Sequence, residues 1–527
     1  MSPRIVAQYP KSANEPKVHP LIRDSFVFVP SAGMRLAPEI LVLEFMREVF
    51  FKPHFGNPTG TKDLDPEEID EERHYCFSNR ERAVLHALRG RRKKSKNSAD
   101  QRFFAPAYPQ LAKRGWLGKN RERVINNFLL SGPVAQHLWN RGPEHQEGKR
   151  RQQILVEKIW RALLGNKTYL DNQDLNGKDI LSVTLGPASF DSDMKLAEMN
   201  LKVITRQQNS VIRDINDDEL ANRITWDLEA ICDLEKTLPR MQWLQLLMTF
   251  LRFALPMWLL AQMQITRIVH GWVQDAVDRG EIIDDEIIKS RLAKRNRGLL
   301  HPTLTPTREL YEHIEQYMKC RVELNRLLYC LEEIRGNEIK GRKLNLNGGG
   351  RDVLGIDQLL ILASEASCEI REMDYFKQVT DGLDVQTFLT REGEQFSAWR
   401  NPLMRGQGKN IDEFFRVLYR SELGDEAGGY LLVPEGRGAK RGFRVFPGQL
   451  LLKTMSYLAA QSKWSCQGSS GGGMLVLQDV EDHFNQYGID FSTAADARPL
   501  LMNELRSMGL LMGSPDAGSS VAVACPY

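Results

Sequence analysis

Apolar residues recur at helical spacing through the middle of the chain. In "DDELANRITWDLEAICDLEKTL", residues 217–238, they form one face of a helix that opens with acidic residues, as helix N-termini favour. That face consists of Leu220, Ile224, Leu228 and Ile231. A longer helix is predicted over residues 306–336, ending at Gly336, with a 4-3 repeat too short for a coiled coil. Its apolar positions are Leu310, Ile314, Tyr317, Leu324, Leu328 and Leu331.

Between these two helices lies the most apolar stretch of the chain, from Trp243 to Ile265. It is long enough to span a bilayer, which takes about 20 residues. However, Arg252 and Pro256 stand near its middle, and a central arginine costs on the order of 2.5–3.5 kcal/mol in lipid. We therefore expect a buried helical hairpin in a soluble protein without a membrane partner.

Shifts in composition along the chain predict four domains in a mainly α fold. A chain of 527 residues is too long for a single core, and the loop "LNLNGGGRD" separates a helical body from a mixed region. The predicted domains are an N-terminal helical region (1–165), a central helical domain with the hairpin and the long helix (166–345), a mixed α/β region (346–445) and a small α/β domain (446–527).

Composition narrows the compartment and the partners. The net charge of +3 is nearly neutral, so a basic binding surface must be local. The seven cysteines are scattered, without a C-x-x-C pair, which argues against a disulfide framework and a zinc ribbon. The first 20 residues contain no apolar core of signal-peptide length. These features predict a cytoplasmic location.

Positive charge is concentrated between Arg80 and Arg123, a segment that contains fourteen Lys or Arg residues and three acidic residues. Aromatic rings are interleaved among the cations: Phe103, Phe104, Tyr108 and Trp116. Cations for phosphates together with rings for stacking are typical of nucleic-acid surfaces. The alternative is a basic loop neutralised by the acidic run "DLDPEEIDEER" that precedes it.

Motifs for catalysis are missing from the sequence. The Gly-rich stretches lack the lysine and hydroxyl that a phosphate-binding P-loop requires, and no histidine stands four residues from another. Glu369, Glu372 and Asp374 could serve a metal-dependent nuclease, but they equally fit the solvated face of a helix. We predict no cofactor, no metal site and no catalytic residue.

The last 80 residues follow a recognisable order of elements. Three short helices precede two short apolar strands joined by "SPDAG". Ser492 or Thr493 is expected to cap the third helix, with Leu501 and Leu505 on its buried face. This order resembles a winged helix, a variant of the helix-turn-helix fold.

The resemblance implies that the third helix enters the major groove of DNA with Arg498, Asn503 and Arg506. That helix also carries Asp496 and Glu504, and the expected wing has no basic residue. Since many winged helices bind protein, both kinds of partner stay open. The nearest dense cations lie upstream, in "GRGAKRGFRVF".

The sequence therefore predicts a non-catalytic protein that binds DNA non-specifically, through the DNA phosphates. Its other predicted partners are further protein subunits of the same system. In general character it resembles accessory subunits of bacterial defence and DNA-processing systems. One alternative is a protein–protein adaptor, and another is a metal-dependent nuclease. The predicted DNA-binding residues are Arg89, Arg91, Arg92, Lys93, Lys94, Lys96, Lys113, Arg114, Arg437, Lys440, Arg441, Arg444, Arg498 and Arg506.

Overall fold

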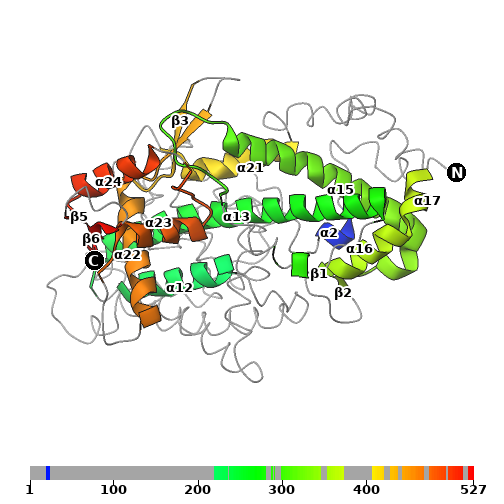
Figure 1. The fold of residues 1–527 in the computed structure, drawn as a ribbon, viewed down its shortest axis with the longest axis horizontal. Coiled ribbons are helices and arrows are strands. Elements are labelled where there is room, and N and C mark those ends of the chain that lie inside the picture. The colour runs from blue at the N-terminus through cyan, green and yellow to red at the C-terminus, as the bar shows by residue number, and fades with distance from the viewer. Residues whose placement is uncertain are drawn as a thin grey trace, which may run out of the picture.

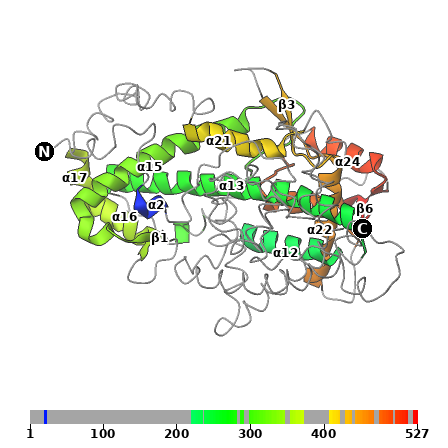
Figure 2. The same ribbon diagram turned by 180° about the vertical axis from the view of Figure 1, so that it is seen from behind.

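Two long helices lie side by side along the long axis of the molecule, α13 (Arg240–Arg279) and α15 (Glu309–Ile339) (Figures 1 and 2). This computed structural model describes residues 19–23, 219–234, 237–280, 286–288, 290, 298–345, 353–372, 406–420, 428–436, 442–467, 474–493, 496–513 and 520–527. Helix accounts for 69% of the described part, which confirms the mainly α class.

Shorter elements surround this pair. The helices are α2 (Pro20–Arg23), α12 (Glu219–Asp233), α16 (Ile356–Glu365), α17 (Ser367–Glu372), α21 (Gly406–Phe415), the 3-10 turn η8 (Arg416–Leu418), α22 (Gln449–Gln467), α23 (Leu477–Gln486) and α24 (Ala497–Ser507). The described strands form a parallel pair, β1 (Lys343–Asn345) with β2 (Val353–Gly355), and two antiparallel pairs, β3 (Leu432–Glu435) with β4 (Gly442–Val445) and β5 (Leu511–Met512) with β6 (Ala522–Val523).

The predicted hairpin between Trp243 and Ile265 is wrong, because α13 runs through Pro256 without a turn. A proline inside a helix costs about 3 kcal/mol. Burying a single large apolar side chain contributes about 1.5–3 kcal/mol, and nearly every apolar side chain around Pro256 is buried. Packing therefore outweighs the local cost of the proline, and α13 ends only at Gly280, which adopts the left-handed conformation with φ 68°.

α13 has the length and the apolar composition of a helix that could span a membrane. Among the described residues, one stretch, Gln242–Arg279, is long and apolar enough to cross a bilayer. Of its apolar 18-residue window, 89% is buried inside the structure, and core helices of soluble proteins pass the same test. The buried Arg252 donates hydrogen bonds from Nε and Nη2 to the carbonyl oxygens of Val417 and Tyr419, so its polar head is satisfied by η8 and the residue after it.

The other two helices predicted from periodicity are present. α12 buries all four residues of its predicted face, and α15 buries all six of its own. The predicted end of α15 at Gly336 is displaced to Ile339, after a kink at Arg335 (φ −116°, ψ 34°). Ile339 is buried in the core beside β1 and β2, so packing extends the helix past the glycine.

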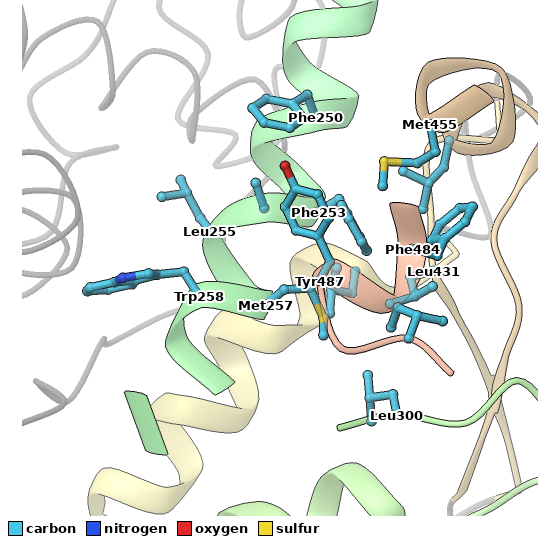
Figure 3. Close-up of a cluster of buried hydrophobic side chains, with 14 of the residues drawn as sticks. Phe250, Phe253, Leu255, Met257, Trp258, Leu300, Leu431, Met455, Phe484 and Tyr487 are labelled. Carbon is cyan, nitrogen blue, oxygen red and sulfur yellow. The ribbon is translucent and has the colours of Figure 1, made fainter. Parts of the chain in front are cut away.

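Buried side chains form two hydrophobic clusters along α13 and α15. The first joins α12, the N-terminal part of α13 and the start of α15 to the β3–β4 pair and the C-terminal helices. Figure 3 shows its centre, where Phe253 of α13 meets Phe484 and Tyr487 at ring-centroid distances of 6.0 and 5.0 Å. The second cluster joins the C-terminal part of α13 and of α15 to α16, β1 and β2.

A polar layer separates the two clusters. On α13 it contains the buried residues Gln262, Thr266 and His270, spaced four apart, and on α15 the buried Arg321 and Asn325. The helical spacing places the first three on one face of α13. Thr266 donates its hydroxyl to Gln262 O of the same helix, whereas His270 reaches Glu323 of α15, so this last contact ties the position of α13 to that of α15.

His270 is the ionisable residue that α13 contributes to this layer. Its Nε2 lies 2.8 Å from Glu323 Oε2 of α15. Burial disfavours the imidazolium, but hydrogen bonds with Cys320 and Glu323 and their Coulomb attraction overcome it and raise the pKa of His270 to about 9. His270 is therefore protonated at neutral pH.

The C-terminal elements occur in the predicted order, α22, α23, α24 and then the β5–β6 ribbon. The predicted cap of the third helix is wrong: α24 begins at Ala497, after Asp496. Ser492 instead donates from its backbone N–H and its hydroxyl to Asp490 Oδ1, and this local turn uses the side chain that the cap would have needed. Whether this arrangement is a winged helix stays a prediction.

The charge on His270 makes stability depend on alkaline pH. When the pKa of a histidine rises from 6.5 to about 9 on folding, its contribution to the free energy of unfolding is complete below pH 6.5. This contribution disappears as pH rises through 9. We expect the free energy of unfolding, measured by urea denaturation, to fall by up to about 3 kcal/mol over this range. His270→Gln should remove most of this dependence, whereas His313→Gln should retain it, because burial lowers the pKa of His313. An equal pH dependence in the His270→Gln variant would contradict this assignment.

Leu505→Ala should destabilise the protein by about 2–5 kcal/mol, because its fully buried side chain would leave a cavity. Arg506→Ala, one residue away on the exposed face of α24, should change stability by no more than about 0.5 kcal/mol. Thermal melts of the full chain measure both, since α23 packs on α13 and an isolated tail would lose that contact. Equal losses in the two variants would show that the register of α24 is wrong.

Candidate nucleic-acid interface

Three of the predicted DNA-binding residues belong to the described part: Arg444, Arg498 and Arg506. The others lie outside the described residues: Arg89, Arg91, Arg92, Lys93, Lys94, Lys96, Lys113, Arg114, Arg437, Lys440 and Arg441. Only the first three can therefore be placed on a surface, and each has a different environment.

Arg444 lies on the outer face of a small sheet. β3 pairs with β4, and two flanking segments extend the pair through the bridges Tyr419↔Leu432 and Thr307↔Phe443. The inner face carries aromatic rings: Phe443 lies 4.7 Å from Tyr419 and 4.9 Å from Tyr311, centroid to centroid. Since strand side chains alternate between faces, Arg444 points away from this core. It forms an ion pair with Glu435, and both side chains are more than a third exposed.

The same sheet places Arg420 beside Arg444. Arg420 is exposed, and it follows the inward-facing Tyr419. Its backbone N–H donates to Leu432 O at 2.7 Å, which holds the residue at the edge of β3. Arg420 and Arg444 therefore stand on either side of Val433, two strand spacings apart, or about 10 Å. No pattern in the sequence singles out Arg420, because only the parallel bridge to β3 brings it here.

Arg498 holds α24 against α23. Its guanidinium forms two hydrogen bonds with the buried carboxylate of Glu481, one of them at 2.7 Å, and a third with Gln478 Oε1 at 3.3 Å. The hydrogen bond with Glu481 raises the pKa of Arg498. Contact with a DNA phosphate would require breaking this pair, which leaves a buried charge without its partner at a cost of about 3–5 kcal/mol. Arg498 is a structural residue in this conformation.

Arg506 occupies the opposite environment. It is exposed on α24, away from the buried Leu501 and Leu505, and its Nη1 donates to Asn503 Oδ1 at 3.3 Å. Asn503 and Ser507 are exposed beside it. This polar face has the hydrogen-bonding groups that the resemblance to a winged helix implies. Of the two arginines of α24, Arg498 is paired with a carboxylate, and Arg506 bonds to an amide.

A cluster of potentially catalytic side chains is buried at the contact between α12 and α23. Tyr487 Oη donates to Asp227 Oδ2 at 2.6 Å, and His483 Nε2 lies 3.0 Å from the same oxygen. Burial, followed by the charge of Asp227, raises the pKa of Tyr487 well above its ordinary value. All three residues are at most 2% exposed, so no substrate reaches them, and the cluster serves to join the two helices.

Two of the three carboxylates considered for a nuclease belong to the described part. Glu369 and Glu372 are exposed on α17, and Asp374 lies outside the described residues. Within the ranges that the structure describes, no group of three His, Cys, Asp or Glu side chains could hold a metal ion.

Comparisons of the chain with known protein families, with curated proteins and with solved structures find no match.

Proposed function

We propose that this protein binds DNA with little sequence preference, through its phosphates, as a non-catalytic component of a multiprotein bacterial system. The observation that carries the proposal is the pair Arg420 and Arg444 on the outer face of the small sheet. Two cations held on the segments that flank β3 suit a chain of phosphates.

The sequence between these two strands contains further positive charge. Between β3 and β4 the sequence reads "GRGAKR", with Arg437, Lys440 and Arg441. The ion pair of Arg444 with Glu435 is exposed, and such pairs stabilise a protein by at most about 1 kcal/mol. A phosphate can therefore replace Glu435 as the partner of Arg444.

A specific observation favours the adaptor function as a second candidate. Val476 pairs with Ala522, which pairs with Met512, so Met474, Val476 and Met512 share one face of the C-terminal ribbon. Met474 and Met512 are 61% and 47% exposed. Exposed apolar side chains that share a face are typical of protein contacts. A protein without measurable DNA binding would favour this function, and magnesium-dependent cleavage of DNA would favour a nuclease.

The double variant Arg420→Ala/Arg444→Ala should weaken binding similarly for DNA of every sequence. Each lost phosphate contact flattens the plot of log affinity against log salt by about 1, so the slope should fall by about 2. The measurement is fluorescence anisotropy between about 50 and 200 mM salt. Arg279→Ala/Arg371→Ala removes the same charge from exposed positions at the ends of α13 and α17, and it should leave the slope unchanged. Equal slopes in both double variants would contradict a role for the sheet.

The basic segment is tested by replacing Arg91, Arg92, Lys93 and Lys94 with alanine. Because these four cations form the densest part of the segment, we expect weaker binding to all sequences and a flatter salt dependence. An unchanged affinity in the same titration would remove this segment from the interface and would support the acidic run at residues 63–73 as its partner.

A further inference from the structure

Arg420 and Tyr430 form a cation–π pair at the edge of the small sheet. The guanidinium carbon of Arg420 lies 5.5 Å from the centroid of the Tyr430 ring, within the range of a cation–π contact. Arg420 is exposed and Tyr430 is half-buried. The ring therefore supports one side of the guanidinium, while the arginine stands toward solvent.

The backbone on both sides of the pair is held in place. Gly448 N donates to Tyr430 O at 2.8 Å, just as Arg420 N donates to Leu432 O. The chain before Tyr430 packs so closely on this segment that a Cβ on Gly448 would lie 2.1 Å from Gly428 O. Any residue but glycine would separate the two segments here. The position of Tyr430 is thus set by close backbone packing.

A planar cation supported by a ring can do more than neutralise a phosphate. Proteins that bind unpaired nucleotides stack the bases on aromatic side chains or on the plane of an arginine. Inside a duplex both faces of each base are covered by neighbouring bases. A stacking contact of this kind therefore distinguishes unpaired bases from paired ones, which phosphate contacts alone do not.

We propose that the Arg420–Tyr430 pair stacks on an unpaired base, so that the protein prefers single-stranded DNA to duplex DNA. The inference rests on the proposed function and specifies its substrate. The backbone of Arg444 lies about 10 Å from that of Arg420 across β3, so Arg444 can contact a phosphate of the same DNA strand. Gln449 follows Gly448, whose backbone N–H donates to Tyr430 O, and its Nε2 is 3.5 Å from Glu504 Oε2 of α24.

The test compares anisotropy titrations of the full chain with a single-stranded oligonucleotide and with a duplex, each about 20 nucleotides long. The wild type should bind the single strand about tenfold more tightly, the effect of one base stack. Arg420→Lys keeps the charge and loses the plane, so it should weaken binding of the single strand about tenfold more than binding of the duplex. Tyr430→Leu should act in the same way, and Tyr527→Leu, at a tyrosine that is 39% exposed, should have no effect.

The outcomes separate the two proposals. Absence of binding to either DNA would overturn the proposed function together with this inference. Equal binding of single strand and duplex by the wild type, or equal weakening of both by Arg420→Lys, would overturn the inference and leave phosphate binding in place. If Tyr430→Leu does not fold, Arg420→Lys decides the matter, because an exposed side chain of the same charge leaves the buried sheet face unchanged.

Discussion

Burial of α13 along most of its length is the constraint on which the rest of the structure depends. A helix of 40 residues extends for about 60 Å, and its apolar side chains face neighbours on several sides. α12 and α22 cover it at one end, α15 along its length and α16 at the other end. A helix that is apolar on all sides is stable in water only when such elements surround it, so each neighbouring element takes its position from α13.

The polar groups along this helix decide how the neighbours dock. Arg252 can be buried only where carbonyl oxygens meet its guanidinium, and η8 supplies Val417 O next to Tyr419 O. This contact places the segment that leads to Arg420 against the helix. The layer around His270 has a similar effect between α13 and α15, because a shift along the axis would separate the imidazolium from Glu323. Apolar packing alone would tolerate such shifts.

Five arginines of the described part divide into two kinds according to their partners. Arg252 and Arg498 use their guanidinium groups to join elements, one through backbone oxygens and the other through the buried Glu481. Arg420, Arg444 and Arg506 stand on outer faces, where their partners are a ring, an exposed carboxylate and an amide. Only the second kind can exchange its partner for a phosphate at little cost, because no buried charge is left behind.

The sequence by itself determined the helices with regular apolar spacing, since periodicity records which face of a helix is buried. The faces predicted for α12 and α15 and the buried pair Leu501 and Leu505 are confirmed on that ground. Only the tertiary structure decided that α13 continues through Pro256, because the burial that outweighs a proline comes from residues distant in the chain. The same holds for the candidate site. Arg498 and Arg506 lie on the same predicted helix, and what distinguishes them is that Glu481 of another helix reaches only Arg498. Arg420 lies near Arg444 because of a bridge to β3 that no local sequence pattern encodes.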